Sequence, residues 1–187
     1  MSRTMAAWLL AAAIAFPASA LAQGKEEKRQ DVRDVAQNTL ERLYKAQPHA
    51  KDAVERSAGY AVFSNFGMKI LFAGGGQGSG IAVNRKAKKE TFMKMVEVQA
   101  GLGIGVKKFR LVWVFEKQSD LDAFINKGWE LGGQATASAQ LSGQGQELYA
   151  GAMSIKPGVW LYQLSDDGLA VELTAKGTKY YKDDSLN

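Results

Sequence analysis

The chain has 187 residues, with 24 basic and 19 acidic side chains that give a formal net charge of +5. It contains no cysteine and one histidine, which excludes disulfides, thiol chemistry, zinc sites with thiolate ligands and metal sites built from several histidines. The mild basic excess suits contact with an anionic surface without requiring it.

The first 22 residues have the layout of a secretory signal peptide. A positively charged start precedes an apolar run over Met5–Phe16, and small residues then lead to a cleavage site after Ala22, with Ala20 as the alternative. The apolar run is shorter than the roughly 20 residues that a transmembrane helix needs. We therefore expect residues 1–22 to be removed and residues 23–187 to form a single exported domain.

Two helices are predicted at the start of this domain. Apolar residues at three- and four-residue spacing predict an amphipathic helix over Gln30–Ala46, after charged residues 24–29 that we expect to fray. Its apolar stripe contains Val32, Val35, Ala36, Thr39, Leu40, Leu43 and Tyr44. The opposite face mixes both charges, which favours docking on the protein's own sheet over a position in lipid. Pro48 ends this helix and opens a second one over His49–Ser57.

Beyond Gly59 the pattern changes to β-strands. Turn-forming residues predict a turn at Ser64–Gly67 and a charged loop at 84–90. An Asp-Gly pair predicts a hairpin that joins 159–164 to 169–174, and residues 176–187 are predicted to be a polar tail. The other predicted strands lie at 60–63, 69–73, 91–99 and 110–115, the second of them running into a glycine ladder.

A third helix is predicted between these strands. Ser119 is its expected cap, and Gly132–Gly133 its expected end. Its apolar face is expected to contain Leu121, Phe124, Ile125 and Trp129. Two N-terminal helices, one inserted helix and about seven short strands predict an α+β fold, with a curved, mostly antiparallel sheet or partial barrel.

Two glycine ladders place glycine at every second position, which is the side-chain period of a β-strand. They contribute Gly76, Gly78 and Gly80, and then Gly101, Gly103 and Gly105. A strand face without side chains loses packing and costs backbone entropy. We expect these faces to form a groove for a lipid, together with Phe66, Met68 and Phe72, or else to let two layers pack closely.

Motifs for catalysis and nucleotide binding are missing from the sequence. The first ladder lacks the third glycine of a dinucleotide fingerprint and continues as a strand, and no phosphate-binding loop occurs. His49 is alone and is predicted to be solvated, as are the acid pairs Asp166–Asp167 and Asp183–Asp184. We therefore predict no catalytic residues, no metal site and no cofactor.

Basic residues gather in two predicted loops. The first contains Arg85, Lys86, Lys88 and Lys89, and the second contains Lys107, Lys108 and Arg110. If the strands that these loops end are neighbours, the two groups form one patch that meets anionic lipid head groups. The alternative is a hairpin tip that adds solubility and protects a sheet edge. Nucleic acid is disfavoured because export removes the protein from it and no aromatic-basic platform is evident.

Several segments together resemble the SYLF domain, a lipid-binding domain. The resemblance spans roughly Val32–Lys182 and includes both glycine ladders in order. Its segments are Ala58–Phe63, Phe66–Lys69, Gly74–Val83, Gln99–Gly105, 115–132 and Gly168–Glu172.

The resemblance implies a lipid-binding module rather than an enzyme. Eukaryotic relatives bind phosphoinositide membranes and, in yeast, actin. This chain is similar to the stand-alone, exported bacterial branch, for which phospholipid or the membrane surface of the cell envelope is the natural partner. We therefore expect a periplasmic protein. The alternative is a structural or protein-interaction protein of the envelope without a lipid ligand, whose protein partner the sequence does not identify.

Overall fold

The computed structural model describes residues 17–70, 73–100, 105–131, 140–141, 147–165, 168–169 and 177–187. The helices in these ranges are α1 (Pro17–Ala46), α2 (His49–Arg56) and α3 (Gln118–Lys127), with a short 3-10 turn η1 (Glu147–Tyr149). The long strands are β1 (Gly59–Ile70), β2 (Ala73–Asn84), β3 (Lys89–Ala100) and β4 (Gly105–Phe115). The shorter strands are β5 (Trp129–Leu131), β6 (Gln140–Leu141), β7 (Met153–Lys156), β8 (Val159–Ser165), β9 (Gly168–Leu169) and β10 (Thr178–Lys182).

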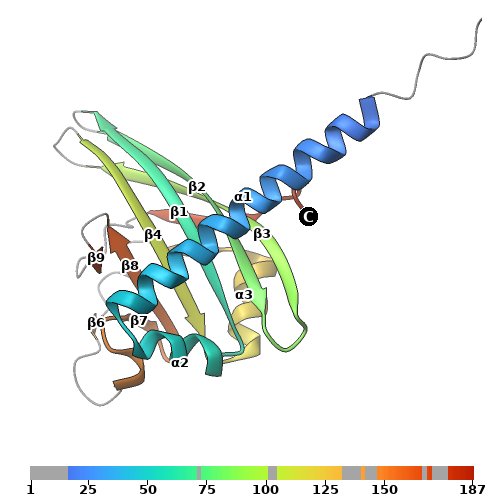
Figure 1. Ribbon diagram of the computed structural model, residues 1–187. Helices are drawn as coiled ribbons and strands as arrows, with labels where there is room; N and C mark the ends of the chain where they lie inside the picture. The colour runs from blue at the N-terminus through green and yellow to red at the C-terminus, as the bar shows by residue number, and fades with distance from the viewer. Residues whose placement is uncertain are drawn as a thin grey trace, which may run out of the picture.

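The strands form one strongly curled antiparallel sheet in the order β5-β10-β3-β2-β1-β4-β8-β7-β6, with β9 paired to β8. β4 follows β3 in sequence but pairs with β1, which gives β1 to β4 the strand order of a Greek key. α1 lies across one face of the sheet, and α3 lies behind it (Figure 1). The predicted α+β fold with a curved antiparallel sheet is confirmed.

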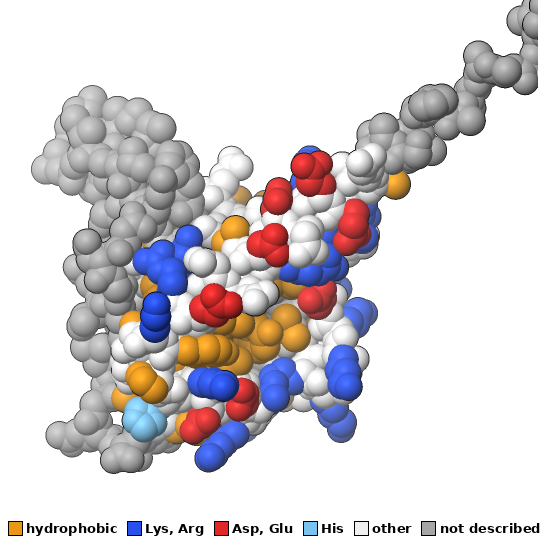
Figure 2. Space-filling view, in the orientation of Figure 1, with side chains coloured by type: hydrophobic (Ala, Val, Ile, Leu, Met, Phe, Trp, Pro, Cys, Tyr) orange, Lys and Arg blue, Asp and Glu red, His pale blue; other side chains and the backbone are white. Residues whose placement is uncertain are grey.

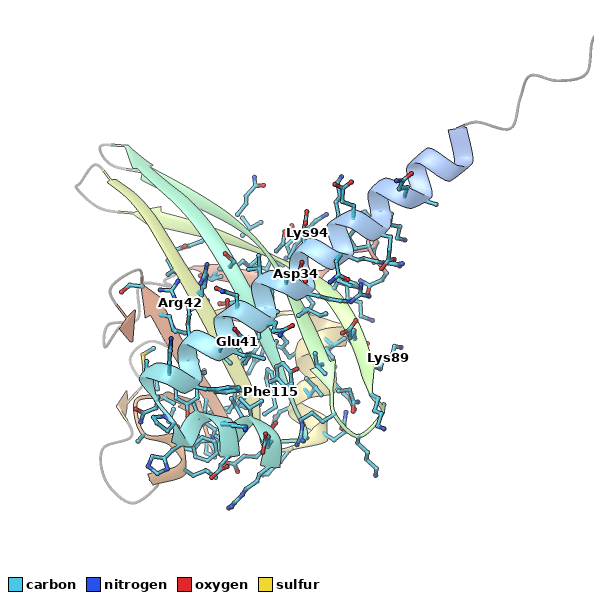
Figure 3. All side chains as sticks on the ribbon, in the orientation of Figure 1. Asp34, Glu41, Arg42, Lys89, Lys94 and Phe115 are labelled. Carbon is cyan, nitrogen blue, oxygen red and sulfur yellow. The ribbon has the colours of Figure 1, made fainter. Side chains whose placement is uncertain are left out.

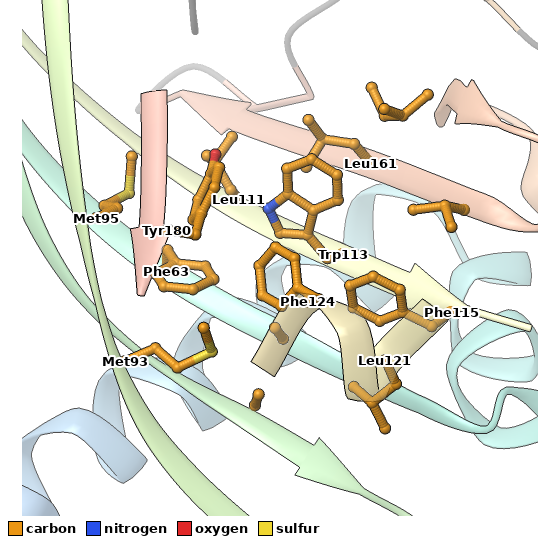
Figure 4. Packing of buried hydrophobic residues seen from close by; sticks show 14 of the residues in the cluster. Phe63, Met93, Met95, Leu111, Trp113, Phe115, Leu121, Phe124, Leu161 and Tyr180 are labelled. Atoms are coloured by element: carbon orange, nitrogen blue, oxygen red, sulfur yellow. The ribbon is translucent and has the colours of Figure 1, made fainter. Parts of the chain in front are cut away.

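Successive side chains along each strand point to opposite faces of the sheet, and both faces are apolar. On the α3 face, aromatic rings from α3, β1, β4 and β10 pack together, with Phe124 against Phe63, Trp113 and Tyr180 (Figure 4). On the α1 face, α1 and α2 cover a second cluster that contains Leu43, Val54, Val62, Ile81, Val112 and Tyr162. The predicted docking of the first helix on the sheet is confirmed.

The N-terminal helix is longer than predicted. Residues 24–29 are helical rather than frayed, because the end of the chain holds them. Lys25 Nζ donates to the carbonyl of Asn187 at 2.9 Å, and Arg29 Nε donates to the carbonyl of Leu186 at 2.7 Å. The Arg29 and Arg33 guanidinium groups also lie 5.7 and 5.3 Å from the centre of the Phe92 ring, within cation–π range.

The predicted turn at Ser64–Gly67 is wrong, because β1 continues through it. Ser64 pairs with Ser79 on β2 and with Arg110 on β4, so strands on both sides supply hydrogen-bond partners to this stretch. Flanking strands override the local preference of serine, asparagine and glycine for turns.

The bounds of the third helix also differ from the prediction. α3 begins at Gln118 after Lys117 and ends at Lys127, where Gly128 takes a φ of 70°. Trp129 therefore lies on β5 rather than on the helix, and it packs on the same apolar cluster from there.

The predicted polar tail is a strand with an ordered end. β10 pairs with β3 and β5, and Tyr180 is fully buried. Asp183, expected to be solvated, is buried at 4% exposure, where it accepts hydrogen bonds from Ser185 and pairs with Lys94. The β8–β9 pairing of Leu164 with Leu169 agrees with the predicted hairpin. Asp166 and Asp167 lie outside the described residues, as does most of the predicted strand 169–174.

Candidate functional site

A groove of about 880 Å³ lies between α1 and the α1 face of the sheet. Its volume falls within the range of about 300–1,000 Å³ that small-molecule sites in proteins have. One wall is α1, the floor comes from β1, β2, β3 and β4, and the ends are formed by β8 and by the chain end after β10.

One row of register partners forms much of the floor. From one end to the other, the row is Tyr181, Lys94, Ser79, Ser64, Arg110 and Leu164, and all six line the groove. Two residues away along β1 and β2, Val62 and Ile81 pack in the cluster that α1 covers. Space therefore remains where the short side chains of Ser64 and Ser79 replace larger apolar ones.

The groove exposes apolar side chains to solvent. Among the described residues, the large hydrophobic side chains that are exposed are Val35 at 38%, Val96 at 36% and Tyr181 at 37%. All three line this groove. Single exposed apolar residues need no explanation, but three that share one hollow indicate a binding surface.

An ion pair lies at the β10 end of the groove. Lys94 Nζ is 2.8 Å from a carboxylate oxygen of Asp183. Burial alone would raise the pKa of Asp183, but the Lys94 ammonium and the Ser185 hydrogen bonds outweigh it and hold that pKa below its usual range. The hydrogen bond to Asp183 raises the pKa of Lys94 in turn. Both groups are therefore charged at neutral pH.

Two arginines lie at the opposite end. Arg42 Nη2 donates to the carbonyl of Ser165 at 3.0 Å, and Arg110 Nη1 donates to Oδ1 of Asn38 at 3.0 Å. Figure 3 shows Arg42 and Lys94 well separated along the length of α1. Basic side chains therefore lie at both ends of the groove.

The backbones of Gly78 and Gly80 line the groove, but a Cβ on either residue would point to the opposite face of the sheet. A Cβ on Gly78 would lie 2.6 Å from Cγ of Met95, and one on Gly80 would overlap the ring of Phe63. Both neighbours belong to the apolar cluster on the α3 face. Close packing accounts for these two glycines, whereas the groove lies on the other side of the same strand.

The remaining predicted groove residues are only partly described. Gly76 is buried on β2, and Gly105 starts β4 opposite Lys69. Phe66 and Met68 lie on β1, but their side chains fall outside the described part. Phe72, Gly101 and Gly103 lie wholly outside the described residues.

The structure does not bring the two predicted basic groups into one patch. Arg85, Lys86, Lys88 and Lys89 lie at or beside the β2–β3 turn, where blue side chains gather at the lower right of Figure 2. That turn is level with Gly59 on β1, whereas Lys107 pairs with Gly67. Eight residues of strand, or about 27 Å, separate the two levels. Only the backbones of Lys107 and Lys108 are described; among the other five residues, Arg110 lines the groove.

The sequence-based predictions missed most of the groove. From the sequence, Val35 is expected in the apolar stripe that docks on the sheet, and Tyr181 and Asp183 are expected in a polar tail. The available signal lay in β2, where the polar residues Gln77 and Ser79 share one face with the buried Ile81.

Other kinds of site find no support in the described ranges. No three histidine, aspartate or glutamate side chains there come together as a metal site would require. The lone His49 is exposed at the start of α2. Among the described helices, none combines the length and apolarity that crossing a bilayer demands.

Comparisons with known proteins agree with the resemblance seen in the sequence. Residues 96–187 match a family model described as "Ysc84: Las17-binding protein actin regulator". The chain is also similar to beta cell expansion factor A of Aeromonas veronii, with 34% identity over 162 residues that cover 86% of this chain and 59% of that protein. The chain therefore belongs to the Ysc84 (SYLF) family.

Proposed function

We propose that the protein binds a phospholipid or a related amphiphile, without catalysis, in the groove beneath α1. The observation that carries this proposal is the grouping of Val35, Val96 and Tyr181, which are the exposed large apolar side chains of the described chain and all line one hollow. Basic side chains from both walls add the means to hold a polar head.

Family membership supports binding rather than chemistry. The SYLF resemblance implies a lipid-binding module, and the family model is described by protein binding and actin regulation. The chain spans about three fifths of the length of the Aeromonas veronii relative, so the activities of that longer protein are not assigned to this chain.

A protein-interaction module without a lipid is the second candidate. It is supported by the glycine ladder, because the spaces over Gly78 and Gly80 are taken by Met95 and Phe63 rather than left for a ligand. The description of the family model as Las17-binding supports the same candidate.

The proposal includes export. The pattern of residues 1–22 supports secretion to the periplasm, where envelope phospholipid is available. Cleavage after Ala22 would leave Gln23–Ala46 of α1, which includes Lys25 and Arg29, whose side chains bind the chain end. Mass spectrometry of protein recovered from the periplasm should give a chain that starts at Gln23, and an uncleaved chain in the cytoplasm would contradict export.

The groove is tested by filling it. Ser79 is exposed in the floor, so Ser79→Leu should leave the apolar clusters intact while it occupies the ligand's space. We expect roughly 5- to 150-fold weaker binding of a fluorescent fatty acid, since overpacking costs about 1–3 kcal/mol. Ser119→Leu adds the same side chain at an exposed position on α3 and should bind as the wild type does.

Native mass spectrometry of the purified protein adds a direct measurement. The wild type should carry a lipid that Ser79→Leu lacks, and the two proteins should have the same melting temperature once lipid has been removed from both. A wild type that neither carries nor binds any lipid would contradict the proposal. Unchanged binding by Ser79→Leu would move the site away from this groove.

A further inference from the structure

We infer that the first half of α1, residues 23–35, is a lid on the groove, and that polar contacts with β3 and with the chain end at residues 183–187 keep it closed. A ligand enters and leaves when this half moves away from the sheet. The inference rests on the proposed function and adds how access to the same groove is controlled.

The two halves of α1 are attached to the sheet in different ways. Ala36, Thr39 and Leu43 are buried at helical spacing in the second half, residues 36–46. None of the described side chains at 22–35 is buried, and Val32 is half-buried. Apolar burial therefore anchors the second half of the helix and contributes far less to holding the first half.

The chain end holds the start of the lid. It is itself fixed on β3, because the side-chain amide of Asn187 donates to the Phe92 carbonyl at 2.8 Å and accepts from the Phe92 N–H at 3.0 Å. Lys25 Nζ donates to the main-chain oxygen of Asn187 at 2.9 Å. Arg29 Nε donates to the main-chain oxygen of Leu186 at 2.7 Å. These contacts position the first half of α1 with charged hydrogen bonds rather than with apolar packing.

A second set of contacts joins the lid to β3. Arg33 pairs with Glu90 at 2.9 Å, and the two side chains are 32% and 42% exposed. The guanidinium groups of Arg29 and Arg33 also lie over the Phe92 ring. Exposed ion pairs and exposed cation–π contacts each stabilise a structure only slightly. We therefore expect an open state, roughly 0.1–10% populated, in which the lid is released and the second half stays docked.

The lid and the chain end form the walls of the groove at its β10 end. The floor at this end exposes the apolar side chains of Val96 and Tyr181. Movement of the lid would uncover this surface, so an alkyl chain reaches it without displacing the anchored half of α1. The lining residues of the two walls are Lys28, Asp31, Val32 and Val35 from the lid and Asp183, Ser185 and Leu186 from the chain end.

Stopped-flow mixing of the purified protein with a fluorescent fatty acid tests the lid through rates. Arg29→Gln/Arg33→Gln removes its charged contacts, so the association and dissociation rate constants should both rise about 3- to 30-fold, with the affinity within about threefold. Damage to the groove itself would raise the dissociation rate constant alone. The matched control Lys45→Gln/Lys51→Gln removes the same charge at exposed positions beside the anchored half and should leave both rate constants unchanged.

A reversible crosslink tests the lid in the opposite direction. The chain has no cysteine, so Arg33→Cys/Glu90→Cys introduces one thiol on the lid and one on β3. A short bifunctional methanethiosulfonate reagent that joins them should keep the lid closed and lower both rate constants at least about tenfold, because the open state is suppressed. Reduction of the crosslink should restore the rates of the unlinked variant.

Hydrogen exchange measures the lid without a ligand. Amides at 27–35 should exchange at least about tenfold faster than amides at 37–46, because opening exposes the first half while the second stays docked. Arg29→Gln/Arg33→Gln should widen this difference, and the lysine control should not.

The outcomes separate the lid from the proposed function. Equal protection of the two halves of α1, or rate constants that neither the arginine variant nor the crosslink changes, would overturn the lid while lipid binding stands. Equal effects of the arginine variant and the lysine control would overturn it as well. If the wild type binds no fatty acid, the proposed function fails, and hydrogen exchange then decides whether this half of α1 opens.

Discussion

The two faces of one sheet show opposite uses of small residues. On the α3 face, Gly78 and Gly80 make room for Met95 and Phe63, and the space is closed. On the α1 face, Ser79 sits between those glycines on the same strand, and the space above it stays open as part of the groove. A small residue in a strand therefore allows close packing where neighbouring side chains fill the space, and it leaves a groove where they do not.

The difference comes from the elements that cover each face. The α3 face receives rings from several directions, since Phe124 contacts Phe63, Trp113 and Tyr180 with ring centres 5.4–6.1 Å apart. The α1 face receives α1 and α2, and α1 buries Leu43 at one part of its length and leaves Val35 exposed at another. Because the sheet curls and the helix is straight, part of the space between them stays open beside α1.

The largest effect should come from the closed face. Phe124→Ala removes a fully buried ring and should lower the free energy of unfolding by about 3–5 kcal/mol. Val35→Ala removes an exposed side chain from the open face and should change it by less than about 0.5 kcal/mol. Urea unfolding measures the free energy of unfolding of both variants. Similar losses in the two would contradict the view that the α3 face is closely packed and the α1 face is open.

The next test compares two glycines of the same strand. In Gly80→Ala the new methyl would overlap the Phe63 ring and the Val62 carbonyl, and we expect a loss of about 2–3 kcal/mol from overpacking. In Gly75→Ala the Cβ would meet the Glu97 carbonyl at 3.5 Å, an ordinary contact, so stability should stay within about 0.5 kcal/mol. Equal melting temperatures for the two variants would contradict the close-packing account of Gly80.

The ordered chain end contributes a smaller, pH-dependent amount. The pKa of Asp183 is lowered in the folded protein, so its contribution is present above the pKa of the unfolded chain and is lost as the pH falls through the folded pKa. Asp183→Asn should therefore lower stability by about 1 kcal/mol at pH 7 and by little at the acidic limit. Urea unfolding across a pH series checks this, and a deficit that is the same at both limits would show that the ionised carboxylate is not responsible.

Patterns within one element predicted much of the fold. The stripe of the first helix, the period-two ladder of β2 and the Asp-Gly hairpin after β8 each depend on residues close in sequence. The sequence does not predict β10, because Thr178 and Tyr180 alternate with lysine and tyrosine in a short segment that becomes a strand through its pairing with β3 and β5. The groove was missed because it depends on where α1 crosses the row of Ser64 and Ser79, which no local pattern contains.

The smallest effect on ligand affinity is expected from the basic turn. Lys86, Lys88 and Lys89 are exposed at the β2–β3 turn, and the five residues of β2 from Ser79 in the groove floor to Asn84 at the strand end span about 17 Å. Changing all three to alanine should leave the affinity for dissolved laurate within about twofold, because screening over a Debye length of about 8 Å isolates the turn from the groove. Binding to anionic vesicles should weaken by contrast, since each basic residue near a membrane contributes on the order of 1 kcal/mol. Co-sedimentation at two salt concentrations measures the second effect and titration the first. If the affinity for laurate and the affinity for vesicles fall together, the turn is part of the ligand site. If only the affinity for vesicles falls, ligand binding and membrane contact belong to different regions.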